Sequence, residues 1–230
     1  PIWLAISLKK SNLKLPKRGD LLSNEVLPIS NHIFIEIKGE NTKGTKKNTK
    51  KLFAGTANKL VEKIYFLNVN KKKYAVVKLN NPIAISEGEK MVLHDIEDNL
   101  FTACEFIMSL KNSSLIKHLI RKSKNKVSYN TLFDLVYFLP FENGDNLIKI
   151  GDLFTNKKNL NHINESIKIG AESINKHGIQ KYLYETFFIN EDTVESLFSE
   201  FDNISIKENQ IKFNTDNTDK DREVLKLILK

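Results

Sequence analysis

The chain has 230 residues, of which 40% are hydrophobic and 28% charged, and its formal net charge is +8 at pH 7. This composition is typical of a folded globular protein and excludes an intrinsically disordered one, and the length is sufficient for one large or two to three small domains. The excess of lysine favours anionic partners, while a lysine- and asparagine-rich sequence can equally reflect a genome bias without functional meaning.

The first hundred or so residues are predicted to be β-structure, because hydrophobic residues alternate at period two. In one stretch Ile33, Ile35 and Ile37 face one side and the residues between them face the other. Within residues 74–95 the runs are separated by Asn80-Asn81-Pro82 and by Glu87-Gly88, an order of strands and turns that is typical of a small antiparallel barrel. Residues 39–50 are predicted to be a loop. The predicted strands span residues 2–8, 29–37, 51–57, 60–67, 74–79 and 90–94.

From about residue 110 the hydrophobic period becomes helical. A first helix, opened by Ser113 or Ser114, has Leu115, Ile116, Leu119 and Ile120 on one face, and the pattern repeats at Leu132, Leu135 and Val136. After a short strand at 147–150, a longer helix is predicted from residue 160 and is expected to end at Gly178, which also opens a second short helix. A third helix at 191–201 and a hairpin at 204–213 follow. Three helices and a two-stranded hairpin predict a winged helix, and residues 111–150 a less regular version of it.

The two ends and the single cysteine bear on the type of protein. Residues 1–8 are apolar but too short to span a bilayer, and no basic region precedes them, so no membrane partner is expected. Residues 218–221 resemble a helix start, yet the sequence stops at Lys230, which predicts a piece of a longer protein. Cys104 lies in an apolar stretch and is interpreted as a small buried hydrophobe, compatible with a reducing cytoplasm.

Several short motifs follow one another along the chain, and their order and spacing are more specific than any one of them. Residues 4–8 and Lys17-Arg-Gly-Asp-Leu-Leu22 are similar to closing strands of a second barrel domain, and Leu52-Phe-Ala-Gly-Thr56 is similar to a third-domain strand. Residues 75–95 are similar to later strands of that domain, and residues 161–213 to a second winged helix. Through these motifs the chain resembles the selenocysteine-specific elongation factors, the SelB family, over nearly its whole length. It departs from them at His94, where the family has Arg, and at residues 99–104, where the family is glycine-rich.

The resemblance implies a multi-domain β + α fold, with a translation-factor antiparallel β-barrel followed by tandem winged-helix domains. It implies closing strands of a second barrel domain at 1–24, a third-domain barrel at 25–110 and a first winged-helix-like domain at 111–156. A second winged-helix domain at 157–216 and the truncated start of a third at 217–230 would follow.

The resemblance also implies a cytoplasmic complete protein that uses GTP and Mg²⁺ and delivers selenocysteinyl-tRNA to the ribosome at recoded UGA codons. A later winged helix would bind an mRNA hairpin. In this chain the barrel would contact tRNA and the GTPase domain, and the winged helices would form a rigid spacer. No Gly-x-x-x-x-Gly-Lys-Ser/Thr loop occurs in the sequence, so this chain is expected to have no cofactor and no GTPase activity.

Basic residues are clustered in the sequence. Such clusters indicate either contact with the phosphates of a nucleic acid or simply a charged surface that faces solvent. One cluster occupies residues 9–18 and a second residues 43–51. In a third, Lys117, Arg121 and Lys124 follow the spacing i, i+4, i+7, which places them on one side of a helix. The candidate RNA-binding residues are Lys43, Lys46, Lys47, Lys50, Lys51, Lys111, Lys117, Arg121, Lys122, Lys124 and Lys126.

The second predicted winged helix has the opposite charge. Residues 178–216 contain eight acidic residues and three lysines, and the predicted helix at 191–201 carries acids only. A recognition helix of this charge would be repelled by a phosphate backbone. The predicted fold therefore suggests nucleic acid in this domain, whereas the charge argues against it.

No catalytic or metal-binding pattern is found. The five histidines are scattered without zinc-ligand spacing, and His94 and Asp95 are adjacent in a predicted strand, so they would point to opposite faces. We therefore expect no catalytic residue and no metal in this chain. The competing interpretation is a winged-helix transcription regulator with a β-barrel sensor domain. An unrelated enzyme is the third alternative.

Overall fold

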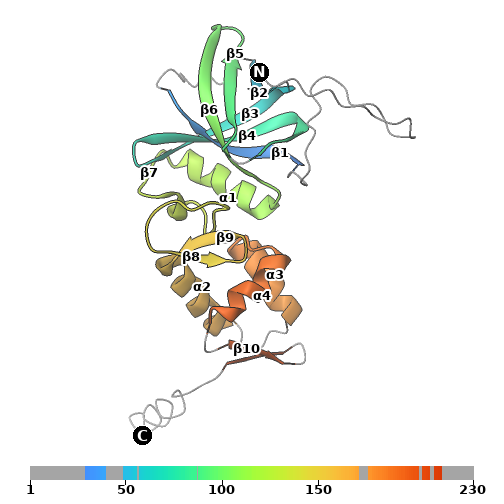
Figure 1. Cartoon of the computed structure of the whole chain (residues 1–230), viewed down its shortest axis with the longest axis vertical. Coiled ribbons are helices and arrows are strands. Elements are labelled where there is room, and N and C mark those ends of the chain that lie inside the picture. The colour runs from blue at the N-terminus through green and yellow to red at the C-terminus, as the bar shows by residue number, and fades with distance from the viewer. Residues whose placement is uncertain are drawn as a thin grey trace, which may run out of the picture.

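The computed structural model describes residues 29–39, 49–55, 57–86, 88–170, 176–201, 204–207 and 210–213. These residues form a β-barrel at one end of the long axis and a helical part at the other (Figure 1). The strand predicted at 2–8, the domains predicted at 1–24 and 217–230, and most of the loop predicted at 39–50 lie outside the described residues.

Six antiparallel strands form the barrel. Their spatial order is β2-β5-β6-β1-β4-β3, and β3 also pairs with β2, which closes the sheet on itself. The prediction of an antiparallel barrel is therefore confirmed. The strands are β1 (Ile29–Ile37), β2 (Lys50–Ala54), β3 (Ala57–Val69), β4 (Lys72–Ala84), β5 (Lys90–Asp95) and β6 (Leu100–Ser109).

The barrel interior is filled by one face of each strand. Ile33, Ile35 and Ile37 share this core with Leu52, Leu93 and other buried apolar residues, as the alternation in the sequence predicted. Phe34, on the opposite face of β1, is equally buried, because the outer wall formed by β1, β3 and β4 is covered by the helical part. Strand β1 is thus buried on both faces.

Two strand ends differ from the prediction. The chain turns at Gly55, whose φ is +54°, and β3 then runs without a break through the positions predicted to separate two strands. Strand β4 continues through Pro82 to Ala84, because a register shift between Ser30 and His32 in the neighbouring β1 accommodates the proline.

The helical part begins with α1 (Ser113–Lys124), which packs against the outer wall of the barrel. The short strand β7 (Ser128–Tyr129) pairs in parallel with β3, and β8 (Leu147–Ile150) and β9 (Leu153–Asn156) form a hairpin. Three further helices and a second hairpin follow. These are α2 (Lys157–Gly170), α3 (Lys176–Thr186), α4 (Glu191–Ser199), β10 (Ile204–Lys207) and β11 (Gln210–Phe213).

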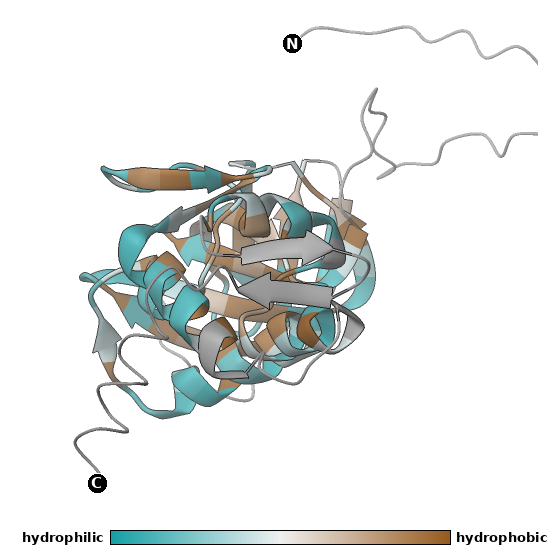
Figure 2. Ribbon diagram, turned by 90° about the horizontal axis from the view of Figure 1, so that it is seen from below, coloured by the Kyte–Doolittle hydropathy of each residue, from teal (hydrophilic) through white to brown (hydrophobic). Residues whose placement is uncertain are grey.

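The helices have one packed and one solvated face. Seen from the helical end, hydrophilic and hydrophobic residues alternate along them (Figure 2). Ile163, Ile167, Leu183 and Val194 of α2, α3 and α4 meet in one core, which also includes Ile150 of β8. In the part of the chain that the structure describes, no helix has the length and apolar character needed to cross a bilayer.

Two helix predictions were wrong in detail. Leu132, Leu135 and Val136 do not lie on a full helix but on a 3₁₀ turn, η1 (Leu132–Asp134), and the chain after it. Most residues of this segment are buried, because their side chains are divided between the barrel-side core and the core of α2–α4. A single apolar helical stripe could serve only one of these two cores. Gly178 does not end α2, which is described to Gly170, but lies in the first turn of α3.

Candidate nucleic-acid interface

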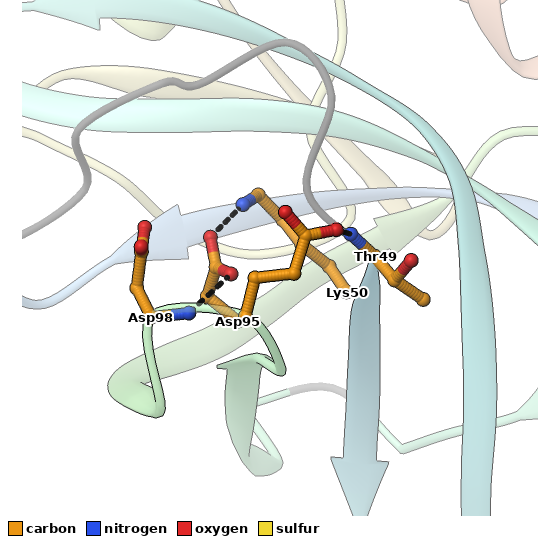
Figure 3. Close-up of polar contacts among 5 residues, drawn as sticks. Thr49, Lys50, Asp95 and Asp98 are labelled. Carbon is orange, nitrogen blue, oxygen red and sulfur yellow. Dashed lines mark hydrogen bonds and ion pairs between the residues drawn. The ribbon is translucent and has the colours of Figure 1, made fainter.

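The lysines on the barrel face in opposite directions. Lys50 points into the barrel end, is 6% exposed and forms an ion pair with Asp95, its register partner on β5 (Figure 3). The adjacent residue, Lys51, points outward and is exposed. The structure therefore removes Lys50 from the candidate RNA-binding residues, because successive strand residues alternate between faces. The candidates Lys43, Lys46 and Lys47 lie outside the described residues.

His94 and Asp95 are separated in the way the strand period requires. The Asp95 carboxylate lies at the barrel end, where it also accepts a hydrogen bond from the backbone N–H of Asp98 (Figure 3). The His94 ring lies outside the barrel and is stacked on Phe101, with ring centroids 4.1 Å apart. The prediction that these two side chains point to opposite faces of the strand is confirmed.

Helix α1 is held at its start by Asn112. The Oδ1 atom of this buried residue accepts the backbone N–H groups of Ser114 and Leu115 at 2.9 and 3.1 Å, and its Nδ2 donates to the carbonyl of Tyr184 at the end of α3. This arrangement satisfies the helix N-terminus and joins α1 to α3. The basic residues of the last turn stabilise the C-terminus of the helix, because the helix macrodipole is negative there.

The basic residues of α1 face solvent, as the helical spacing predicted. Lys117, Arg121 and Lys124 are exposed, while Leu119 on the other side is fully buried. Lys111 and Lys126 flank the helix and are exposed as well. Among the residues that the structure describes, none of these five side chains forms an ion pair with a carboxylate, so all five are available to a phosphate backbone.

Lys122 differs from the other candidates because it is half-buried. Its ammonium group lies over the ring of Tyr129, 5.0 Å from the ring centroid, and it lines a cleft of about 760 Å³ between α1 and α2. The floor of the cleft is the segment that contains η1, including Tyr137, and the opposite wall is α2. Lys122 is therefore placed to contact a bound molecule as well as bulk solvent.

Two histidines that are far apart in the sequence line this cleft. Burial, with the charges of Lys122 and Arg121, lowers the pKa of His118 below its ordinary value, so its ring is neutral at pH 7. His162 of α2 lies parallel to Tyr137, with ring planes 11° apart and centroids 6.0 Å apart. In the described part of the chain no group of histidine, cysteine, aspartate and glutamate side chains is arranged to hold a metal ion.

Sequence reasoning missed the α2 side of this cleft. Lys158, Asn161, His162 and Glu165 line it, and their spacing of i, i+3, i+4 and i+7 is a helical face that the sequence displays. A search for mixed polar faces, in addition to basic ones, would have found these residues. What the sequence does not display is that this face is opposite His118 and Lys122 of α1.

The acidic character of α4 is retained at the surface. Asp192, Glu195 and Glu200 are exposed on and next to this helix, whereas Val194, Leu197 and Phe198 are buried in the core. The interface suggested by charge is therefore α1 and the cleft beside it, and not α4.

Comparison with known proteins gives little. No family model and no curated protein matches this chain. Among solved structures it is similar to the crystal structure of bacterial selenocysteine-specific elongation factor EF-Sec, with 15% sequence identity and a TM-score of 0.40. The match covers 87% of this chain and 37% of that one, so the chain spans little more than a third of that protein's length. A TM-score this low supports no argument about function.

Proposed function

We propose that this chain is the part of a SelB-like translation elongation factor that lies after the GTPase domain. In this proposal the cytoplasmic parent protein uses GTP and Mg²⁺ and delivers selenocysteinyl-tRNA to the ribosome, the barrel contacts the tRNA and the GTPase domain, and the helical part is a spacer. The supporting observation is a closed antiparallel barrel whose motif glycines, Gly55 and Gly88, both have positive φ at turns, at +54° and +69°. Such turns need glycine at these positions, which gives the motifs a physical role.

The helical part has the order of elements that the proposal requires. Helices α2, α3 and α4 are followed by the antiparallel pair β10–β11, and α1 with η1 is followed by the pair β8–β9. We therefore assign two winged-helix modules to residues 111–156 and 157–216, the second of which would not bind nucleic acid through its acidic α4. The mRNA hairpin would be bound by a later module.

A spacer must transmit position, which requires that its parts be rigidly joined. One core unites the outer barrel wall with α1 and the η1 segment, and the next unites Phe138 and Ile150 with α2–α4. The hydrogen bond from Asn112 to the carbonyl of Tyr184 adds a connection between α1 and α3. In this proposal the two adjacent cores make a stiff connection from the barrel to α4 (Figure 1).

The test is equilibrium binding of the purified chain to selenocysteinyl-tRNA, to a seryl elongator tRNA and to duplex DNA. We expect weak binding with a preference for selenocysteinyl-tRNA and a log–log salt slope of roughly −2 to −3, as about three neutralised phosphates would give. Changing Lys117, Arg121 and Lys124 together to Glu should weaken binding to every RNA alike. A preference for duplex DNA would instead favour the transcription regulator and would contradict the proposal.

A further inference from the structure

The cleft between α1 and α2 has features that a structural spacer does not need. Its volume of about 760 Å³ lies within the range of about 300–1,000 Å³ that is usual for ligand sites. Each wall is one face of a helix, since His118 and Lys122 are four residues apart on α1, and Lys158, His162 and Glu165 follow the helical repeat on α2.

Some polar groups in the cleft are held by other protein groups, and others are open to a ligand. The carboxylate of Asp134 is engaged, because it accepts hydrogen bonds from the backbone N–H and the hydroxyl of Thr131 at 2.9 and 3.3 Å. In contrast, Asn130 and Asn161 are exposed, and among the described residues no other protein group binds their side-chain amides. Each amide has hydrogen-bond donors and an acceptor, and these are the groups that bind the edge of a nucleobase.

The cleft also offers an aromatic surface and a connection to the basic face of α1. His162 is exposed, and its ring continues the stack that begins with Tyr137. Lys122 lies at the α1 wall, next to Arg121, and Lys117 and Lys124 are one helical turn away in either direction. A polynucleotide backbone along these cations would therefore pass the mouth of the cleft, and a base could enter it.

We propose that this cleft binds one unstacked nucleotide of an RNA, with the base on His162 between Asn130 and Asn161 and the adjoining phosphates at Lys122 and Arg121. This rests on the proposed function only in taking the ligand to be RNA, and it does not depend on selenocysteinyl-tRNA. A base in this position gains stacking, while hydrogen bonds from the two amides select it against a featureless apolar group.

The test is a proton NMR titration of the whole chain, observing the histidine ring resonances, with octariboadenylate, 5′-AMP and inorganic phosphate as probes. We expect the octamer and 5′-AMP to shift His118 and His162, and inorganic phosphate to leave His162 unchanged. The octamer should bind at least about tenfold more tightly than 5′-AMP, because its further phosphates also reach Lys117 and Lys124, whereas 5′-AMP has a single phosphate for Lys122 and Arg121. Equal affinities would make the cleft a small-molecule site and would overturn the RNA part of the proposal.

Variants separate the cleft from the general electrostatic surface. Lys122→Ala with His162→Ala, one residue on each wall of the cleft, should weaken octamer binding roughly ten- to hundredfold, the range expected for loss of one stacked base and one phosphate contact. The control Lys181→Ala, at an exposed position of α3, should leave binding unchanged. If the double variant binds the octamer like the unmodified chain, or if the octamer does not shift His162, the nucleotide site does not exist.

The outcomes distinguish this proposal from the proposed function. A cleft that binds the octamer while the chain shows no preference for selenocysteinyl-tRNA would retain the nucleotide site and reject the elongation-factor assignment. If the chain prefers selenocysteinyl-tRNA and the cleft variants do not alter this preference, the elongation-factor assignment is retained and the nucleotide site is rejected. Changing Lys117 and Lys124 to Glu should weaken octamer binding but leave the effect of 5′-AMP on His162 in place.

Discussion

Removing one partner of the ion pair between Lys50 and Asp95 should destabilise the barrel strongly. Both residues lie at the barrel end, 6% and 8% exposed, and replacing Lys50 by Met leaves a buried carboxylate without its cation. Losing one member of a buried pair costs about 3–5 kcal/mol. That is a large part of the roughly 5–15 kcal/mol by which a domain is stable, so Lys50→Met should lower the unfolding midpoint markedly.

A second variant shows whether the charge or the packing is responsible. In Lys50→Met with Asp95→Asn the charge is gone, while the side-chain oxygen that accepts the N–H of Asp98 is kept. We expect the double variant to recover roughly half or more of the loss, as a coupled pair should in a double-mutant cycle. The matched control is Lys78→Met, which breaks the ion pair with Glu62 on the barrel surface, where both side chains are 38% exposed. Its cost should stay below about 1 kcal/mol.

The assay is urea unfolding followed by far-ultraviolet circular dichroism, with hydrogen exchange of the Leu52 and Leu93 amides as a local probe of the barrel. The midpoint should fall and the slope should stay constant, since the exposed area on unfolding is unchanged. If Lys50→Met costs no more than Lys78→Met, burial does not strengthen this pair, and the reasoning is wrong. If the double variant is as unstable as the single one, the loss is due to packing and not to charge.

Four further outcomes are expected. Lys122→Gln should raise the pKa of His118, measured by NMR titration, because the change removes one of the two cations that lower it. Since the pKa of His118 is lowered in the folded state, unfolding takes up a proton below about pH 6.5, and the stability of the protein should fall there. This fall should be smaller in His118→Gln. Asn112→Ala should lower the free energy of unfolding, measured in urea, by about 1–3 kcal/mol, because it removes the helix cap and the hydrogen bond to Tyr184. Asn156→Ala should lower it less, because it removes only the hydrogen bond from the N–H of Asn159. Cys104 is 2% exposed and burial raises the pKa of its thiol to about 11, so an aromatic disulfide reagent at pH 8 should react only as fast as the chain unfolds, and rapid labelling of the native protein would contradict this. Calorimetric titration with GTP and Mg²⁺ should show no binding, and a micromolar dissociation constant would refute the reasoning from the missing phosphate loop.

Much of the barrel could be predicted because its information is local. The period-two alternation of Ile33, Ile35 and Ile37 and the turn at Gly88 specify strands and their inward faces without any knowledge of neighbours. The same holds for the basic side of α1, since a helical repeat states which residues lie opposite Leu119. The inward direction of Lys50 was missed because residue 50 was predicted to end a loop, whereas it is the first residue of β2 and lies on the same face as Leu52.

Other features depend on contacts between residues far apart in the chain. The segment after Thr131 has a helical spacing of apolar residues, yet it is mostly not helical, because two cores bury it from both sides. The cleft exists only because the fold brings α1, the η1 segment and α2 together around it, which places His118 and His162 in its lining from positions more than forty residues apart. Periodicity in a sequence states which side of an element is apolar, and it contains no information on what will cover that side. For this protein the sequence alone therefore determined the strands of the barrel and the charge of α1. Only the tertiary structure decided that Lys50 pairs with Asp95, that Lys122 lines a cleft and which polar groups meet one another, because that depends on packing between distant segments.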